Sequence, residues 1–262
     1  MQDILNVVIS SDKRKKILLL LLRGPKPLEE IRGTLKYTTT GMLPQIRILE
    51  ERNLVRREDK KYALTEIGKL ITTFLEPLVQ TAGVIKQQEE FWQEHDVGAI
   101  PPHLFMRISE LGNTRIMKHG VEEIYEPHME FLEMISKSKK VMCISPMVHP
   151  AYPEFLAQLG EKGTEVSIVL TKITFDRVKK EYSDALARAL SSKKVSFYIS
   201  EDIKLTSIVT DSFFNISLFY KNGVFDSRND LISLDKSALL WGEELFNYYK
   251  ERSKKVTSID NP

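Results

Sequence analysis

The stretch IRGTLKYTTTGMLPQIRILEERNLVRREDKKYALTEIGK, residues 31–69, decides the fold of the N-terminal third of the chain. Over residues 40–53 the apolar side chains have the spacing of a helix with one buried face. Residues 54–64 have apolar ends and a charged centre, as expected of a two-stranded hairpin with a solvated tip. Thr65 and Glu66 then start another helix, so the stretch predicts a helix, a hairpin and a helix in that order.

Two more helices are predicted upstream of this stretch. The first spans residues 13–22 and ends at Gly24 and Pro25. The second spans residues 27–35 and opens with Pro27 in its first turn, followed by acidic residues at the positive end of the helix dipole. Three helices followed by a hairpin is the element order of a winged helix-turn-helix domain, in which the third helix faces the major groove of DNA.

The charge distribution points to the same partner. Residues 1–75 contain 15 Lys and Arg against 9 Asp and Glu, although the whole chain has a net charge of only +2. A basic N-terminal part on a mildly acidic body suggests that this part meets a polyanion such as double-stranded DNA.

The residues expected to contact DNA lie at the start of the third helix, on its exposed face and in the hairpin. Thr40 is the expected N-cap, and Pro44 falls near the first turn, where a missing amide donor is tolerated. Hydroxyl and backbone N–H groups at a helix start can bind phosphates, and basic side chains in the hairpin can do the same. The candidates are Thr38, Thr39, Thr40, Pro44, Gln45, Arg47, Arg56, Arg57, Lys60 and Lys61.

These residues also have structural explanations that do not involve DNA. The basic hairpin residues would also suit a solvated tip, and the threonines would suit a polar turn. A winged helix can also mediate contacts between proteins. Leu43 and Ile48 on the exposed face of the third helix favour modest sequence specificity.

The second half of the chain has a different pattern, which predicts an α/β layer structure with a partly parallel sheet. Short apolar strands alternate with helices. The strands are expected at 141–145, 165–170, 194–199, 207–211 and 213–220, and the helices at 122–136, 152–161, 175–190 and 236–252.

The overall class is therefore α+β, with a winged helix-turn-helix domain followed by an α/β domain. The expected division of the chain is a DNA-binding domain over 1–75, a helical connector that helps dimerisation over 76–100, an α/β sensor domain over 101–255 and a tail over 256–262. The helix that starts at Thr65 and Glu66 is expected to reach Leu75 and end before Pro77, and Pro101 and Pro102 mark the boundary to the α/β domain.

Two sets of motifs carry family resemblances. Leu49-Glu50, Leu54-Val55, Tyr62 to Thr65 and Gly68 resemble the L-E-x-x-x-L-V and Y-x-L-T-x-x-G motifs of bacterial and archaeal winged-helix transcription regulators. The second half resembles the middle domain of archaeal, largely methanogen, winged-helix regulators named after a filament-formation regulator. The matching residues are Thr210-Asp211, Leu218 to Tyr220, Gly223 with Asp226, Asp230 to Ser233 and Ala238 to Tyr249. Both resemblances imply an archaeal transcription regulator.

The order of strands and helices in the second half is also similar to one half of the phospholipase D fold. Catalytic members of that superfamily need a His followed two residues later by Lys, where the His is the nucleophile. None of the five histidines meets this requirement: His95, His103, His119, His128 and His149. The resemblance therefore implies a domain without catalytic residues.

Other signals narrow the function further. Motifs of nucleotide-binding loops, serine hydrolases and zinc proteases are missing, so no cofactor and no metal are expected. The longest apolar run, residues 17–22, is far shorter than the roughly 20 residues of a membrane span. The N-terminus does not read as a secretion signal, and Cys143 is the only cysteine. A cytoplasmic protein is the simplest expectation.

Small molecules bind α/β sheets outside the carboxyl ends of the strands. The candidate effector-binding residues are therefore those that follow the strands: Ser145, Pro146, His149, Thr171, Asp211 and Tyr220. Cys143 is expected in the core, and the alternative, a redox-sensing thiol, needs exposure and a lowered pKa. His149 suits a pocket wall or a loop cap, and the aromatic residues of the last helix suit core packing or a ligand box.

The sequence thus predicts a homodimeric DNA-binding regulator whose second domain senses a small molecule or a partner without catalysis. One alternative is a constitutive DNA-binding protein whose second domain only mediates dimerisation or protein contacts. The other is an unrecognised phosphodiesterase or nuclease.

Overall fold

The computed structural model describes residues 3–118 and 129–258. The chain divides into two compact units, residues 1–80 and 81–262, which are treated separately below. In the described parts, no helix combines the length and the apolar character that crossing a membrane requires.

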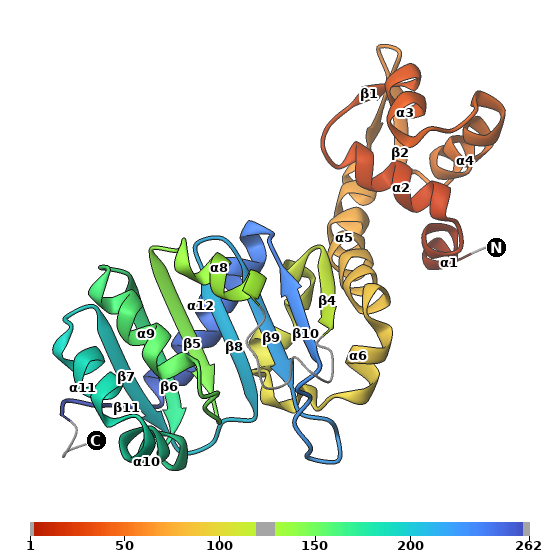
Figure 1. The fold of residues 1–262 in the computed structure, drawn as a ribbon. Coiled ribbons are helices and arrows are strands. Elements are labelled where there is room, and N and C mark those ends of the chain that lie inside the picture. Colours follow the sequence, from red (N-terminus) through yellow and green to blue (C-terminus); the bar gives the residue numbers. More distant parts are fainter. Residues whose placement is uncertain (1–2, 119–128, 259–262) are drawn as a thin grey trace. The chain divides into compact units, whose positions relative to one another are not determined.

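The N-terminal unit is a winged helix-turn-helix domain, as predicted (Figure 1). Its core is formed by side chains of its helices and of the hairpin, and includes Met42, Ile46 and Leu49, which are fully buried. The strands form a three-stranded sheet in the order β1-β3-β2. The elements are α1 (Ile4–Ile9), α2 (Asp12–Leu21), β1 (Lys26–Pro27), α3 (Leu28–Leu35), α4 (Thr39–Glu51), β2 (Val55–Glu58), β3 (Lys61–Leu64) and α5 (Glu66–Gln87).

Two details of this unit correct the sequence prediction. The N-cap of α4 is Thr38, whose hydroxyl accepts a hydrogen bond from the Gly41 N–H at 3.3 Å, so Pro44 lies inside the helix rather than near its first turn. Helix α5 also continues through Pro77 instead of ending before it. Leu75 and Val79, on either side of that proline, pack on the core, and this burial outweighs the one missing backbone hydrogen bond.

Gly68 of the Y-x-L-T-x-x-G motif is required by close packing. A Cβ at this position would lie 1.9 Å from the carbonyl oxygen of Leu54, so α5 can approach β2 only with glycine here. The neighbouring Thr65 hydroxyl donates to the Asn53 carbonyl at 2.6 Å and accepts from the Gly68 N–H at 2.9 Å. These contacts attach the start of α5 to the base of the hairpin.

The C-terminal unit contains an eight-stranded sheet in the order β11-β7-β6-β5-β8-β9-β10-β4. The neighbours β5, β6 and β7 are parallel, whereas β5 and β8 are antiparallel, so the sheet is only partly parallel, as predicted. The strands are β4 (Thr114–Lys118), β5 (Lys140–Ser145), β6 (Glu165–Thr171), β7 (Val195–Ser200), β8 (Leu205–Thr210), β9 (Phe214–Leu218), β10 (Asn229–Ser233) and β11 (Lys254–Lys255).

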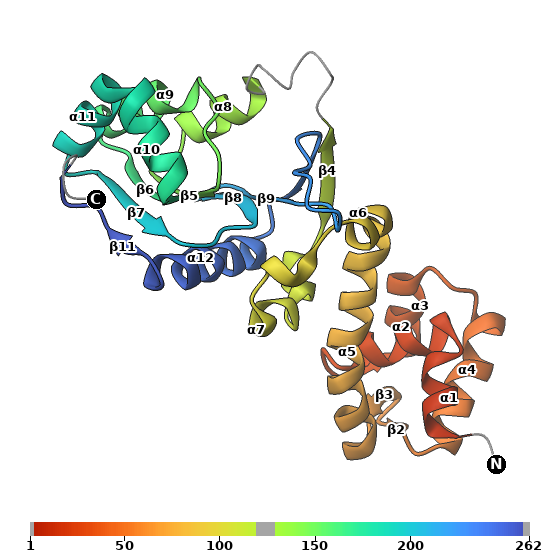
Figure 2. The ribbon, with the colours of Figure 1, turned by 90° about the horizontal axis from the view of Figure 1, so that it is seen from below.

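Helices cover both faces of this sheet. Figure 2 shows α9, α10 and α11 on one face with α8, and α12 on the other. On the α12 side the indole N–H of Trp241 donates to the Leu104 carbonyl at 2.9 Å, and a Cβ at Gly242 would lie 2.4 Å from the Phe214 ring. The helices are α6 (Glu89–Glu94), α7 (Pro102–Phe105), α8 (Met129–Ser136), α9 (Tyr152–Glu161), α10 (Lys172–Glu181), α11 (Ser183–Ser191) and α12 (Lys236–Glu251).

Several elements of this unit differ from the prediction. The helix expected over 175–190 is two helices that break at Tyr182. Strands β4 and β10, which pair with each other at one edge of the sheet, were not predicted because their short sequences mix polar and apolar residues. The helix expected over 122–136 is described only from Met129, and its earlier part lies outside the described residues.

Candidate nucleic-acid interface and ligand cavity

The exposed face of α4 contains most of the residues expected to read DNA. Thr40, Pro44 and Arg47 are exposed, and Thr38 is exposed at the N-cap. Thr39 is half-buried, and its hydroxyl accepts a hydrogen bond from Arg32 at 3.2 Å. The start of α4 therefore presents the Thr38 and Thr40 hydroxyl groups to solvent.

Gln45 differs from its neighbours because it is engaged inside the unit. Its side-chain oxygen accepts a hydrogen bond from Arg14 at 2.7 Å and another from the Ser11 hydroxyl at 3.4 Å. These bonds hold Gln45 against α2. Among the candidate residues of α4, Arg47 is thus the long polar side chain that remains exposed.

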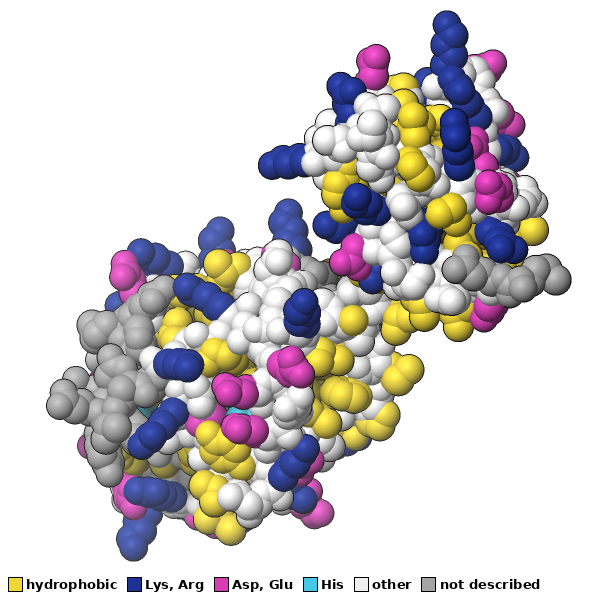
Figure 3. All heavy atoms as spheres, turned by 90° about the vertical axis from the view of Figure 1, so that its right-hand side faces the viewer, with side chains coloured by type: hydrophobic (Ala, Val, Ile, Leu, Met, Phe, Trp, Pro, Cys, Tyr) yellow, Lys and Arg dark blue, Asp and Glu magenta, His cyan; other side chains and the backbone are white. Residues whose placement is uncertain are grey.

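The wing is the hairpin of β2 and β3. Its two turn residues, Asp59 and Lys60, have φ values of 46° and 65°, which is the backbone conformation that matches the twist of a two-residue hairpin. Arg57 lies over the Tyr62 ring at 5.7 Å, and Arg56 forms an exposed ion pair with Glu58 at 2.9 Å. All four basic candidates of the wing are exposed. Figure 3 shows Lys and Arg side chains projecting from the N-terminal unit.

A cavity of about 380 Å³ lies in the C-terminal unit, between the sheet and α8, α9, α10 and α11. Most of its wall is apolar, with side chains from both layers. The apolar residues that line it include Phe131, Ile135, Val141, Leu156, Ile168, Leu170, Val178, Leu186, Phe197 and Ile208. Its volume falls within the range of small-molecule sites, roughly 300–1,000 Å³.

One part of the cavity wall is polar. It is formed by Asn215, Ser217, Asp226 and Asp230, from β9, β10 and the loop between them. The Ser217 hydroxyl donates to the Asp230 carboxylate, and the Asn215 side-chain oxygen accepts from the Ile208 N–H at 2.8 Å.

His149 lines the same cavity. Its Nδ1 accepts a hydrogen bond from the Ala151 N–H at 3.3 Å, and its ring contacts the Tyr152 ring edge-on at 5.7 Å. Its Nε2 is buried and has no hydrogen-bond partner. Among the described residues, no other buried side-chain nitrogen or oxygen lacks a hydrogen-bond partner.

The six candidate effector-binding residues do not all come together. Ser145 and His149 line the cavity, whereas Pro146 and Thr171 lie just outside it and bind Thr174 through the Pro146 carbonyl and the Thr171 hydroxyl. Asp211 follows β8, which runs antiparallel to β5, so it lies beside the start of β5 and not beside its carboxyl end. Its carboxylate accepts a hydrogen bond from the Lys139 N–H at 3.1 Å. Its expected place among the carboxyl ends of the parallel strands is wrong.

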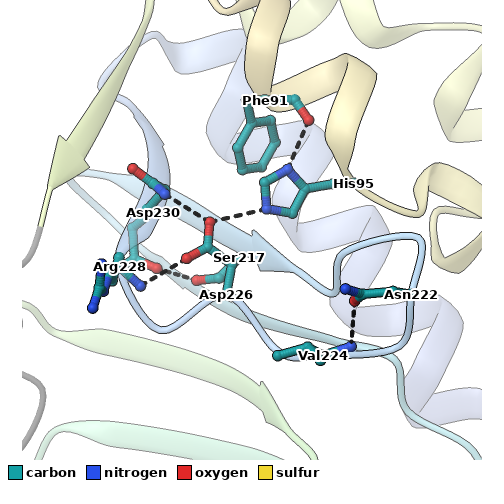
Figure 4. Close-up of polar contacts among 9 residues, drawn as sticks. Phe91, His95, Ser217, Asn222, Val224, Asp226, Arg228 and Asp230 are labelled. Atoms are coloured by element: carbon teal, nitrogen blue, oxygen red, sulfur yellow. Dashed lines mark hydrogen bonds and ion pairs between the residues drawn. The ribbon is translucent and has the colours of Figure 1, made fainter.

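Tyr220 stacks on a buried polar cluster that the sequence analysis missed. Figure 4 shows His95 and Asp226 of this cluster. At its centre, His95 is stacked between Phe91 and Tyr220, with ring centroids 4.4 and 4.5 Å away. Its Nδ1 lies 2.7 Å from the Phe91 carbonyl oxygen, and its Nε2 lies 3.0 Å from the Asp226 carboxylate. The His95 ring thus bridges the Phe91 carbonyl on α6 and the Asp226 carboxylate in the loop before β10.

The carboxylate of Asp226 is the hub of this cluster. It accepts from the Asn229 side chain and from the Arg228 N–H, each at 2.8 Å. Burial raises the pKa of Asp226, but the hydrogen bonds from Asn229, Arg228, Tyr220 and His95 together hold it below the ordinary value. Because Asp226 also lines the cavity, the cluster connects the cavity wall to His95, which directly follows α6.

The family motif contained one signal for this cluster. Asp226 is the aspartate of the G-x-x-D pair that begins at Gly223. Its partner His95 is 131 residues away in the sequence, and the residues around His95 give no indication that it contacts Asp226.

Cys143 is half-buried and lines the apolar part of the cavity. Burial raises the pKa of its thiol to about 12. A redox-sensing cysteine needs the opposite shift. The structure therefore favours the expectation that this residue contributes to packing.

We expect the thiol of Cys143 to react slowly with iodoacetamide. A pKa of about 12 in place of 9.0 leaves about a thousandth of the usual thiolate at pH 8. The rate should rise about tenfold per pH unit up to pH 11, while the protein stays folded. Mass spectrometry of the single modified residue gives the rate. A rate near that of a free thiol at pH 8 would contradict the buried environment.

Two models of one protein family match the chain. The model of the methanogenesis regulatory protein FilR1, N-terminal domain, matches residues 2–82, and that of its middle domain matches residues 124–252. FilR1 of Methanothrix harundinacea (strain 6Ac) is 30% identical over 259 residues, which cover 97% of this chain. This chain spans 58% of the length of that relative.

Two solved structures are similar to the chain. TrmBL2, described as an archaeal chromatin protein with a novel mode of DNA binding, has a TM-score of 0.45 and 14% identity over 93% of both chains. The phospholipase D family member Nuc from Salmonella typhimurium has a TM-score of 0.40 and 12% identity, covering 56% of this chain and 100% of its own.

Proposed function

The chain belongs to the family of the methanogenesis regulatory protein FilR1, and from this premise we propose that it is a DNA-binding transcription regulator. The proposal has three parts. The winged helix-turn-helix unit binds double-stranded DNA, two copies of the chain form a homodimer, and the α/β unit senses a small molecule without catalysing a reaction. A cytoplasmic location follows from this role and stays a prediction.

The observation that carries DNA binding is the arrangement of α4 and the wing. Arg47, the hydroxyls at the α4 N-terminus and the four basic wing residues are presented by one small unit. This combination supplies a helix for the major groove and cations for the flanking phosphates. The exposed Arg47 is the candidate for base contacts, and the wing supplies affinity that does not depend on sequence.

Fluorescence anisotropy with the DNA upstream of the protein's own gene tests this part. We expect binding that is stronger than to a scrambled duplex, with log K falling linearly as log salt increases. Equal binding to both duplexes would remove sequence recognition from the proposal. Lack of binding to either duplex would favour a role of the winged helix in protein contacts.

The support for a homodimer is an apolar stripe on α5. Ile67, Leu70, Phe74 and Leu78 repeat at helical spacing and are 48–73% exposed, so they form one unpartnered face of the helix within residues 1–80. A second copy of the same stripe is a self-complementary partner, as a two-fold dimer requires. Two winged helices would then contact two half-sites, which raises affinity.

We expect the double substitution Leu70→Lys and Phe74→Lys to convert the dimer into a monomer. Burying two such side chains contributes roughly 1.5–3 kcal/mol each, and charges at the interface add a desolvation penalty, so the dimer dissociation constant should rise at least about 100-fold. Sedimentation velocity gives the two populations. Val224→Lys, at a residue that is 59% exposed in the other unit, is the matched control. A wild-type chain that is already monomeric would exclude this part of the proposal.

The cavity of the C-terminal unit supports the sensing part. It lies between one face of the sheet and the helices that cover it, and Ser145 and His149 are among the residues that line it. An effector shifts the regulator only if it binds the DNA-binding and non-binding arrangements with different affinity. Within the described residues, no group of three or more potential metal ligands is found.

A further inference from the structure

The cavity wall defines the chemistry of its ligand. We infer that the cavity binds an uncharged, largely apolar small molecule that carries one hydrogen-bond acceptor, and that the His149 Nε2–H donates to this acceptor. The inference rests on the proposed sensing function and names the class of molecule that is sensed.

The donor is assigned from the hydrogen bonds of the His149 ring. Because Nδ1 accepts from the Ala151 N–H, the ring proton lies on Nε2. This N–H is buried, belongs to a side chain that lines the cavity and has no partner in the described structure. A buried donor without an acceptor destabilises a protein, so such a donor beside an open cavity indicates that a ligand supplies the acceptor.

The charge of the wall excludes anions. None of the described residues that line the cavity is Lys or Arg. A carboxylate or phosphate ligand would therefore be buried without a Lys or Arg partner from the described part of the wall. An uncharged carbonyl, amide or ester oxygen can accept from His149 without that penalty.

The charge of the wall does not favour a cation either. Asp226 already accepts hydrogen bonds from Arg228 and Asn229 and contacts His95, and Asp230 accepts a hydrogen bond from Ser217. Most of the remaining surface is aliphatic or aromatic, from Phe131, Leu156 and the other apolar residues of the cavity. The best match is therefore a molecule with an apolar body and a single neutral acceptor.

Three probes of equal chain length separate these chemistries: octanamide, octanoate and octylamine. Isothermal titration calorimetry of the full chain measures the affinity for each one. We expect octanamide to bind at least about tenfold more tightly than the other two, because only its acceptor is neutral. His149→Phe keeps an aromatic ring but removes the donor, and should weaken octanamide about tenfold.

Two further variants serve as controls. His103→Phe changes an exposed histidine outside the cavity and should leave the affinity for octanamide unchanged. Cys143→Leu adds carbon atoms inside the cavity and should weaken all apolar probes, which places their site there. Circular dichroism confirms that each variant is folded.

Three results would overturn the inference: tighter binding of octanoate or octylamine, no binding of any probe, or an unchanged octanamide affinity of His149→Phe. A separate measurement tests whether ligand binding regulates DNA binding. DNA anisotropy of the wild-type chain is recorded with and without octanamide. If octanamide binds through His149 and leaves DNA affinity unchanged, the ligand class stands and regulation by it fails.

Discussion

Replacing Asp226 by alanine will lower the free energy of unfolding of the C-terminal unit by about 3–5 kcal/mol, because several donors of a buried cluster lose their acceptor at a cost of about 1–3 kcal/mol each. The Asp226 carboxylate is 2% exposed and accepts hydrogen bonds from His95, Asn229 and Arg228. Without it, the buried His95 ring keeps only the Phe91 carbonyl as a hydrogen-bond partner. The loss therefore includes buried polar groups left without a partner as well as the missing hydrogen bonds.

Urea unfolding followed by tryptophan fluorescence measures this loss. The chain has two tryptophans, Trp92 and Trp241, and both lie in the core of the C-terminal unit, so the signal reports the unit that contains Asp226. Asp202→Ala is the matched control, because its carboxylate is exposed and 3.9 Å from Lys204. We expect the control to change stability by less than about 0.5 kcal/mol. A loss below about 1 kcal/mol for Asp226→Ala would show that the hydrogen bonds of this cluster contribute little to stability.

The pH dependence of the same experiment has a definite sign. Because the folded-state pKa of Asp226 is below its ordinary value of 3.8, the unfolded state binds more protons in acid. The stabilising contribution of the carboxylate is present above about pH 4 and is lost as the pH falls through the lowered pKa. The difference between wild type and Asp226→Ala should therefore shrink below about pH 4. A difference that grows in acid would contradict this shift.

The parts of the fold that depend on local periodicity could be predicted from the sequence. Helix α9 and the parallel strands β5 and β6 lie within one or two residues of their predicted positions, because runs of apolar residues bounded by turns report burial directly. The direction of a strand leaves no such local record. The expectation that Asp211 lies beside the carboxyl end of β5 was therefore wrong, since β8 runs antiparallel to β5.

The candidate sites divide in the same way. The exposed face of α4 and the basic wing follow from spacing and charge, and His149 follows from its place after a strand. The pairing of His95 with Asp226 depends on two segments far apart in the sequence. Likewise, the engagement of Gln45 by Arg14 depends on how α2 packs against α4, and helical spacing alone cannot report it. Tertiary contacts decide which polar side chains remain available for a partner.

Substituting all four basic residues of the wing will remove most of the affinity for DNA. If Arg56, Arg57, Lys60 and Lys61 each neutralise one phosphate, the slope of log K against log salt should flatten by about 3.6 per protomer, which is about 0.9 for each contact. At low salt this amounts to a loss of several orders of magnitude in affinity. The loss should be nearly equal for operator and scrambled duplexes, because phosphate contacts carry no sequence information.

Single substitutions rank the four residues. Arg57→Ala should flatten the slope by about 0.9 per protomer, whereas Arg56→Ala should have a smaller effect, because Arg56 must give up its ion pair with Glu58 before it binds a phosphate. Lys162→Ala removes one exposed positive charge from the other unit and controls for net charge. Arg47→Ala should instead reduce the preference for the operator over the scrambled duplex, since α4 is the element that reaches base edges. An unchanged slope in Arg57→Ala, together with an unchanged preference in Arg47→Ala, would assign the winged helix a partner other than DNA.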